Sequence, residues 1–431
     1  MNIALSTLGC KVNQYETAAL EAELRRRGHT LVPFDGPADA YIVNTCTVTA
    51  VSDKKSRQLI RQARKRSPEA VVAVCGCYAQ TAPEAVAALG VDLVAGSAGR
   101  MAFLDDLEGL LVRREPEPLV TVDNIFTHRA FEALSGGGLE GRTRAMLKVE
   151  DGCVNFCTYC IIPYARGAVR SLPIEGARRE LGRLLEAGYR EIVLTGIEIS
   201  SWGRDLPGEP PLIDLLEALC RDLPAHVRLR LGSLEPRTIT PGFCRRAAAL
   251  PNLCPHFHLS MQSGCDTVLA RMHRHYDTAR YYKSVTLLRE YFPNPGLTTD
   301  LIVGFPGETE EEFQETLAFV ERCAFSAMHI FPYSRRTGTP AAQMPDQVPN
   351  AVKEARAHRA AALAGRLEAA YLDALVGSTL PILFEDRHGE VWRGHAPNYA
   401  EVLAPGEDLH NREVPVRITG REGSRLLGEL V

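Results

Sequence analysis

The sequence lacks any apolar run long enough to cross a membrane, and we see no secretory signal among its first residues. It also lacks a strong charge of either sign, because 49 basic against 53 acidic residues give a formal net charge of −4. This balance argues against a surface that is basic throughout and made for nucleic acid, although it permits local patches. We therefore expect a cytoplasmic protein with no membrane contact.

One residue type is abundant: cysteine occurs 12 times in 431 residues. Disulfides are rare in a reducing compartment. A chain of this length, with 45% hydrophobic residues, also buries a sufficient core without cross-links. Cysteines that are not needed for disulfides indicate metal binding or catalysis wherever their spacing matches that of a metal or catalytic site.

The first part of the chain alternates strands with helices. Apolar runs predict strands at residues 3–8, 40–44, 70–75 and 92–96, and periodic stretches predict helices at 14–27, 50–66 and 83–89. Such alternation is typical of an open parallel sheet in an α/β layer. Residues 115–118 and 136–138, rich in proline and glycine, bracket a linker, and we end the first domain at residue 125.

The middle of the chain, residues 139–367, repeats a strand–helix unit six times. Predicted strands lie at 145–149, 191–195, 227–231, 257–261, 298–303 and 327–331. Six such units favour a partial (β/α)6 barrel resembling the TIM barrel, with a second doubly wound sheet as the alternative. After a long helix at 352–373, residues 371–431 show short strands separated by Gly, Asp and Pro, which predicts a small OB-like β-barrel.

Three cysteines, Cys153, Cys157 and Cys160, lie within eight residues directly after the first predicted barrel strand. Thiolates at this spacing can bind three irons of a [4Fe–4S] cluster and leave the fourth iron open. A zinc site needs a fourth ligand close by, and none follows until His226. An open iron–sulfur cluster at the barrel mouth is therefore the favoured interpretation.

A second group consists of Cys10, Cys46 and either Cys75 or Cys77, each placed at the end of a predicted N-terminal strand. The carboxyl ends of parallel strands share one edge of the sheet, and ligands bind there. The placement predicts a second metal site. Three buried structural cysteines are the alternative.

The Cys153–Cys160 loop resembles the signature of the radical S-adenosylmethionine (SAM) superfamily. Further segments resemble the methylthiotransferases in motif order over nearly the whole chain: LGCKVNQYE at 8–16, VNTCTVT at 43–49, GCYAQ at 76–80, LTG at 194–196, SLEP at 233–236, QSG at 262–264 and TDLIVGFPGET at 299–309. The C-terminal module resembles a TRAM domain. The segment GCKVNQYE is similar to the branch that modifies N6-threonylcarbamoyladenosine in tRNA.

The resemblance implies two [4Fe–4S] clusters and SAM as cofactors. One cluster would be held by Cys153, Cys157 and Cys160, and the other by Cys10, Cys46 and Cys77. Cys77 is preferred to Cys75 because it occupies the family's Gly-Cys-x-Ala-Gln motif. The residues expected around SAM, each of which can also be a polar loop or capping residue, are Tyr159, Gly196, Glu198, Ser233, Glu235 and Gln262.

The implied reaction attaches a methylthio group to C2 of threonylcarbamoyladenosine at position 37, next to the anticodon. The same chemistry on isopentenyladenosine tRNA or on a ribosomal protein is an alternative, as is a non-catalytic iron–sulfur RNA-binding protein. The expected partners are the tRNA anticodon loop and an electron donor such as flavodoxin or ferredoxin, with the chain a monomer.

Two basic clusters are candidates for RNA phosphate contact or for ordinary solvated faces. The first places seven cations on the predicted helix at 50–66: Lys54, Lys55, Arg57, Arg61, Arg64, Lys65 and Arg66. The second consists of Arg271, His273, Arg274, His275 and Arg280.

Overall fold

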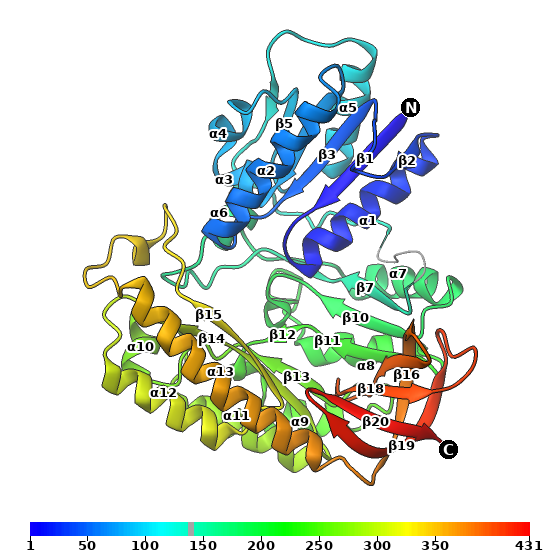
Figure 1. Cartoon of the computed structure of the whole chain (residues 1–431). Coiled ribbons are helices and arrows are strands. Elements are labelled where there is room, and N and C mark those ends of the chain that lie inside the picture. Colours follow the sequence, from blue (N-terminus) through cyan, green and yellow to red (C-terminus); the bar gives the residue numbers. More distant parts are fainter. Residues whose placement is uncertain (137–141) are drawn as a thin grey trace.

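The computed structural model describes residues 1–136 and 142–431. Gly137, Gly138 and residue 139, where the second domain is expected to start, lie outside the described residues. An N-terminal α/β domain sits above a central α/β body, and a small β-barrel packs beside that body at the C-terminus (Figure 1). No helix among the described residues is both long and apolar enough to span a membrane.

The N-terminal domain is an open, fully parallel sheet, as predicted. Its order is β2-β1-β3-β4-β5-β6. The strands are β1 Asn2–Thr7, β2 Thr30–Val32, β3 Ala40–Thr45, β4 Val71–Gly76, β5 Leu93–Ala95 and β6 Leu119–Thr121. The helices are α1 Lys11–Arg26, α2 Ala50–Arg66, α3 Cys77–Thr81, α4 Pro83–Ala87 and α5 Arg100–Val112. Helices α1 and α5 cover one face of the sheet and α2 and α4 the other.

Several elements of this domain were not predicted. They are strands β2 and β6 and helices α3 and α5, and β6 lies in the segment expected to be a linker. Both strands have only three residues, and all of β6 is exposed, so neither carries a readable apolar pattern. Helix α1 begins at Lys11, earlier than predicted, because extended Cys10 serves as its N-cap residue.

The central body is a partial barrel of parallel strands in two sheets, β11-β10-β7 and β12-β13-β14-β15. The strands are β7 Arg144–Lys148, β10 Glu191–Thr195, β11 Arg228–Leu231, β12 Ser233–Leu234, β13 His256–Leu259, β14 Gly296–Val303 and β15 Ala327–Pro332. Because β12 follows β11 after a single residue, these strands occupy six positions, which confirms the partial barrel.

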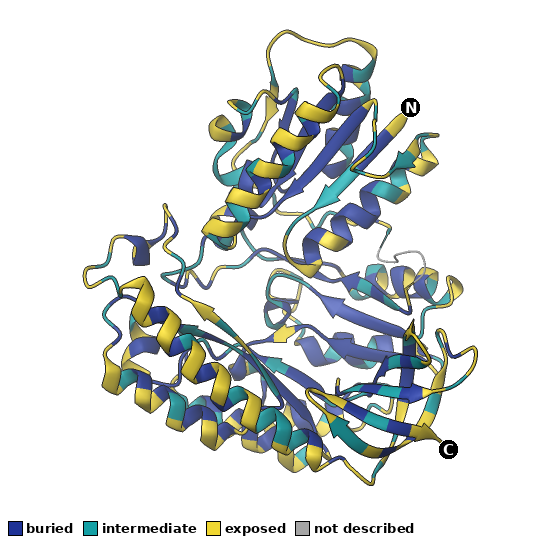
Figure 2. Ribbon diagram, in the orientation of Figure 1, coloured by how far each residue is buried: buried dark blue, intermediate teal, exposed yellow. Residues whose placement is uncertain are grey.

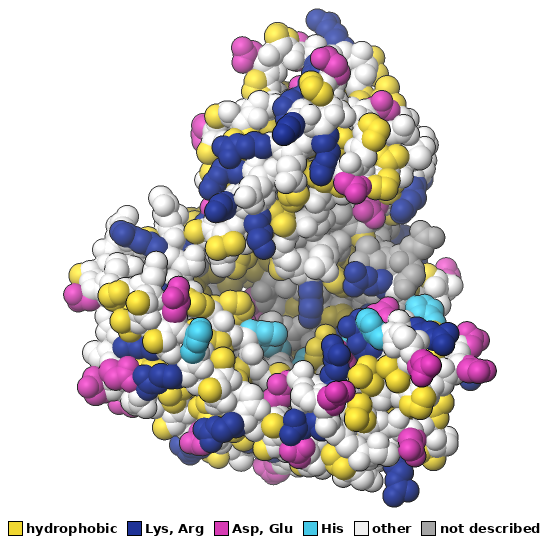
Figure 3. All heavy atoms as spheres, viewed as in Figure 1, with side chains coloured by type: hydrophobic (Ala, Val, Ile, Leu, Met, Phe, Trp, Pro, Cys, Tyr) yellow, Lys and Arg dark blue, Asp and Glu magenta, His cyan; other side chains and the backbone are white. Residues whose placement is uncertain are grey.

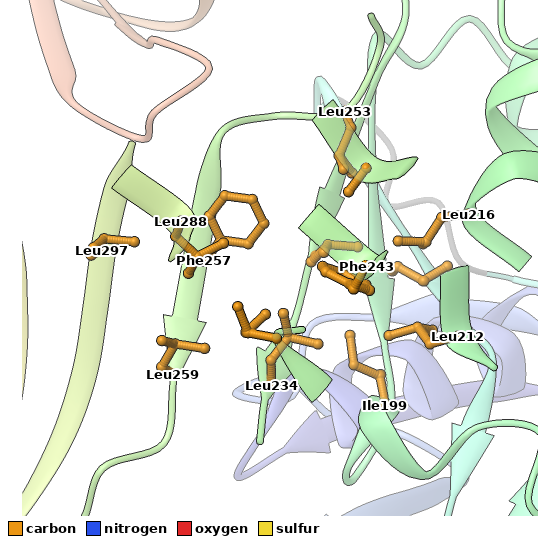
Figure 4. Close-up of a cluster of buried hydrophobic side chains, with 14 of the residues drawn as sticks. Ile199, Leu212, Leu216, Leu234, Phe243, Leu253, Phe257, Leu259, Leu288 and Leu297 are labelled. Atoms are coloured by element: carbon orange, nitrogen blue, oxygen red, sulfur yellow. The ribbon is translucent and has the colours of Figure 1, made fainter. Parts of the chain in front are cut away.

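The helices of this body pack on the outside of the strands. The six longest are α7 Ile174–Glu186, α8 Leu212–Asp222, α9 Pro241–Ala248, α11 Thr278–Tyr291, α12 Glu310–Cys323 and α13 Asn350–Asp373. Phe257, Leu288 and Leu297 belong to the continuous core between strands and helices (Figure 4). Most of these strands are buried, whereas β15 is partly exposed and the outward face of α13 is exposed (Figure 2).

The C-terminal module is the predicted small barrel, closed in the order β16-β17-β18-β20-β19. Its strands are β16 Thr379–His388, β17 Val391–His395, β18 Glu401–Pro405, β19 Glu413–Glu422 and β20 Arg425–Leu430. The loop between β17 and β18 docks on the central body. The ring of Tyr399 in this loop stacks on His256 of β13 at 4.8 Å and on His395 at 4.9 Å.

A buried ion cluster joins the two barrels. Glu191, at the start of β10, is fully buried and accepts hydrogen bonds from Arg228 Nε at 2.6 Å and from Arg230 Nε at 2.7 Å. The same arginines donate to backbone carbonyls of His395 and Pro397 at 2.8 Å. Burial alone raises the pKa of Glu191, but the two guanidinium groups hold it well below its usual range.

We expect Glu191→Gln to reduce the free energy of unfolding by about 3 kcal/mol at pH 7, because it leaves buried Arg230 without its counter-charge and Arg228 with Glu413 alone. The pKa of Glu191 is lowered on folding, so its contribution is present above the unfolded value of about 4.3 and fades as the pH falls through the folded value. Urea titrations at several pH values measure this difference. Glu175→Gln, at an exposed carboxylate, is the matched control, and equal midpoints for both variants contradict the prediction.

Candidate functional site

The loop after β7 and β8 (Glu150–Asp151) brings its three cysteines to a cavity of about 200 Å³ at the mouth of the partial barrel. Cys153, Cys157 and Cys160 line one side. The other lining includes five of the six residues expected around the cofactor: Tyr159, Glu198, Ser233, Glu235 and Gln262. These residues follow different strands, so the fold gathers at one mouth what the sequence keeps apart.

The carboxylates of this cavity differ in their partners. Glu198 accepts a hydrogen bond from the backbone of Ser200 at 3.1 Å and from Asn155 Nδ2 at 3.5 Å. Burial and the neighbouring Glu235 raise the pKa of Glu198. Glu235 is already paired with Arg237 through two hydrogen bonds of 2.8 and 2.9 Å. Glu198 is therefore the carboxylate here without a cationic side-chain partner in the described part of the chain.

Gly196 is absent from the residues that line the cavity. A Cβ atom at this position would lie 2.7 Å from Glu150 Oε2, so glycine leaves room for the Glu150 carboxylate. That carboxylate accepts a hydrogen bond from the backbone amide of Glu198 at 2.7 Å. Gly196 thus acts on the cavity through packing, and Glu150, which sequence reasoning missed, positions the segment that carries Glu198.

A second residue missed by sequence reasoning is Arg274. Its Nη1 donates to Cys157 Sγ at 3.2 Å, and its Nε donates to the Tyr276 hydroxyl at 3.0 Å. The sequence alone places it in a basic cluster that is a candidate for RNA contact. In that cluster Arg271 pairs with Glu312 at 2.6 Å, and Arg280 donates to Ser284 and to backbone carbonyls. All three arginines are engaged within the protein, so this cluster is not a free basic face.

The second cysteine group lies at the carboxyl edge of the N-terminal sheet. Cys10, Cys46 and Cys77 follow β1, β3 and β4. Burial raises the pKa of each thiol. The charge of a neighbouring thiolate in the group raises each pKa further: that of Cys46 affects Cys10, that of Cys77 affects Cys46, and that of Cys10 affects Cys77. Gly9 permits this closeness, because a Cβ there would lie 2.8 Å from Cys46 Cβ. The fold therefore brings the three thiols together.

The remaining cysteines belong to the interior. Cys75 is fully buried in the apolar core between the sheet and helices α1 and α5, and it is separated from Cys77 because β4 ends at Gly76 and Cys77 begins α3. The other five, expected to be core or surface thiols, are all buried: Cys220, Cys244, Cys254, Cys265 and Cys323.

One buried arginine connects the two cysteine groups. Arg166 ends α6 (Ile162–Arg166), the short helix that directly follows the Cys153–Cys160 loop. Its Nε donates to Cys77 Sγ at 3.2 Å, its Nη2 donates to Asn13 Oδ1 at 2.6 Å, and its Nη1 pairs with Glu16. The two groups of thiols therefore lie on either side of a single short helix.

Glu16 on α1 is the centre of a buried ionic network. Besides Arg166, its carboxylate accepts from Arg100 Nη2 at 2.6 Å and from Lys148 Nζ at 3.0 Å. Burial opposes ionisation, but these cations hold the pKa of Glu16 well below its usual range. Glu16 lies in the motif at residues 8–16, but nothing in the sequence pointed to its partners.

The donor sets fit iron–sulfur clusters, in which each cysteine thiolate binds a different iron. Each set consists of three thiols, Cys153, Cys157 and Cys160 in one and Cys10, Cys46 and Cys77 in the other. Each group also faces a guanidinium, Arg274 or Arg166, that donates to a cysteine sulfur.

Helix α2 keeps much of its predicted basic surface. Lys54, Lys55, Arg61, Lys65 and Arg66 are exposed. Arg57 donates to the Tyr78 hydroxyl at 3.1 Å, and Arg64 pairs with Asp92. Lys54 and Lys55 lie in the first turns of the helix that follows Cys46, near the edge of the second cysteine group, whereas Lys65 and Arg66 lie at its far end.

Two family models match the chain. Residues 147–320 match the radical SAM superfamily, and residues 2–96 match an uncharacterized protein family designated UPF0004. A Bacillus subtilis protein named threonylcarbamoyladenosine tRNA methylthiotransferase MtaB is 41% identical, over 96% of this chain and 93% of its own. A Nitratidesulfovibrio vulgaris protein named tRNA-2-methylthio-N(6)-dimethylallyladenosine synthase is 36% identical, over 99% of this chain and 97% of its own.

Among solved structures, the radical SAM methyltransferase TsrM from Kitasatospora setae has a similar fold. It superposes with a TM-score of 0.60 at 16% sequence identity, covering 85% of this chain and 89% of its own. At this identity the likeness concerns the fold alone. The full-length relatives and the matching family models together show that the chain belongs to the radical SAM methylthiotransferases.

Proposed function

We propose that this protein converts N6-threonylcarbamoyladenosine, next to the anticodon of tRNA, to its 2-methylthio derivative. The observation that carries the proposal is the pair of cysteine groups on either side of α6, one at the barrel mouth and one at the sheet edge. A methylthio transfer needs two such centres close to one substrate atom. The names of relatives that match nearly the whole chain support this choice of substrate.

The residues of this chain divide between two cofactor sites. Cys153, Cys157 and Cys160 would hold one [4Fe–4S] cluster beside SAM, and the sheet-edge group Cys10, Cys46 and Cys77 would hold the other. When bound, the two clusters and SAM supply the one-electron cleavage of SAM and the sulfur to be transferred. Glu198 offers a carboxylate to the SAM ammonium, and Tyr159, Ser233 and Gln262 supply polar groups around it.

We also propose partners for this protein. The anticodon loop would reach the site with its phosphates against the exposed cations of α2. Flavodoxin or ferredoxin would supply the electron, and the protein would act as a cytoplasmic monomer. We assign residues 1–125 to the domain of the sheet-edge cluster, residues 139–367 to the SAM barrel and residues 371–431 to the C-terminal barrel.

The function is tested by nucleoside mass analysis after reaction with tRNA. We expect 2-methylthio product from tRNA that carries threonylcarbamoyladenosine and none from the same tRNA with unmodified adenosine. The reduced, reconstituted protein with SAM and an electron donor is the complete reaction. Product from isopentenyladenosine tRNA, with none from threonylcarbamoyladenosine tRNA, contradicts the proposed substrate but is consistent with the proposed methylthio transfer.

Iron content tests the two sites. Anaerobic reconstitution should give about eight irons per chain, and replacing Cys153, Cys157 and Cys160 together by alanine should leave about four, because the sheet-edge group is untouched. Iron is measured against protein concentration. The replacement of Cys220, Cys244 and Cys254 by alanine is the control and should keep about eight. Full iron in the first variant rules out the loop as a cluster site.

The choice between Cys77 and Cys75 is tested by single substitutions. Cys77→Ala should abolish methylthiolation, because a missing thiolate destabilises the sheet-edge cluster. Cys75→Ala removes a buried core sulfur at a cost of about 1 kcal/mol and should keep most activity. Product formation and iron content are measured for both variants. An equal loss in both contradicts the assignment of Cys77 as the ligand.

A further inference from the structure

A cavity of about 570 Å³ lies where the three parts of the molecule meet. Its walls come from α1, from β7, β10 and β11 of the partial barrel, and from the C-terminal barrel. Its volume is in the range of sites for small molecules or single nucleosides. The space-filling view shows a hollow below the N-terminal domain with basic and histidine side chains at its margin (Figure 3).

The lining of this cavity is rich in positive charge. Five cations face two carboxylates: Lys11, Arg142, Arg144, Arg230, Arg393, Glu385 and Asp386. Both carboxylates are already paired, Glu385 with Arg144 at 2.8 Å and Asp386 with Arg393. Arg230 is held by Glu191 outside the lining. The charge left over is therefore positive.

Lys11 and Arg142 carry that unbalanced charge, because neither makes a hydrogen bond or ion pair with any described residue. Of the two, Lys11 is adjacent in sequence to a proposed cluster ligand, and it is exposed. It is the first residue of α1 and directly follows Cys10, a proposed ligand of the sheet-edge cluster. A base whose C2 atom faces that cluster can thus extend a substituent toward Lys11 in the cavity.

The rest of the lining favours a polar substituent over a stacked base. The aromatic ring of Tyr399 is already stacked on His256 and His395, and its hydroxyl accepts a hydrogen bond from Arg144 Nη1 at 3.1 Å. The threonylcarbamoyl group ends in a carboxylate that is ionised at neutral pH, whereas an isopentenyl group is uncharged. A cavity with an unpaired ammonium suits the first group.

We infer that Lys11 binds the carboxylate of the threonylcarbamoyl group and so selects the modified adenosine. This inference rests on the proposed function and deepens it. Lys11 touches the substrate without taking part in bond making, so it determines specificity. Arg144 holds the opposite wall in place, because it donates hydrogen bonds to the Tyr399 hydroxyl and to the Glu385 carboxylate.

The test compares two synthetic anticodon stem–loops, one with threonylcarbamoyladenosine and one with its methyl ester, which removes only the negative charge. The reconstituted wild-type protein should bind the acid about 10-fold more tightly than the ester, equivalent to about 1.4 kcal/mol. Lys11→Gln should abolish this preference and leave the affinity for the ester unchanged. Lys283→Gln, at an exposed lysine of α11 on the outer side of the barrel, should keep the preference.

Other outcomes overturn the inference. If Lys11→Gln lowers the affinity for acid and ester equally, Lys11 contacts the phosphate backbone. If neither affinity changes, Lys11 makes no contact with the substrate. Lys11→Arg restores the charge beside Cys10 and should keep the preference; its loss in this variant, with iron content at the wild-type level, also overturns the inference. Failure of the proposed function is distinct, because the wild-type protein would then form no product from threonylcarbamoyladenosine tRNA.

Discussion

The buried ionic network around Glu16 is the constraint on which the site depends. A carboxylate with almost no exposure is surrounded by Arg100, Lys148 and Arg166, which come from the N-terminal domain, the partial barrel and the helix after the cysteine loop. Removal of one partner from such a network leaves an uncompensated buried charge, which proteins tolerate poorly. Helix α1 is therefore held in one position against the barrel. The separation of the two cysteine groups follows from that position, because Arg166 also contacts Cys77.

The same device occurs at both cysteine groups. Arg166 donates to Cys77 and Arg274 donates to Cys157, each through a guanidinium that is largely enclosed by protein. Hydrogen bonds to sulfur and nearby charge are among the factors that set the potential of an iron–sulfur cluster. The protein thus places one fixed positive charge beside each proposed cluster. The open side of the barrel cavity is left to Glu198, whose carboxylate has only uncharged partners among the described side chains.

Local pattern predicted the elements better than it predicted the contacts between them. Helix α2 and strand β10 were predicted to the residue, because each carries a long amphipathic or continuous apolar run. Strand β6 was missed, because three exposed residues become a strand only by pairing with β5. The cysteines were found through motifs and strand ends. Arg166 and Arg274 were not, since the sulfur atoms that they contact lie 89 and 117 positions away in sequence.

The docking of Tyr399 has a consequence for the order in which the protein forms during synthesis. This ring packs against side chains of β7, β11 and β13, and a Cβ at Gly296 of β14 would lie 2.0 Å from the carbonyl oxygen of Asn398. The loop between β17 and β18 therefore has no surface to dock on until β7, β11, β13 and β14 have formed their sheets. Domains generally fold as the chain emerges, N-terminal parts first. The C-terminal barrel, which is synthesised after the central body, thus closes a surface of that body that stays open to water until then.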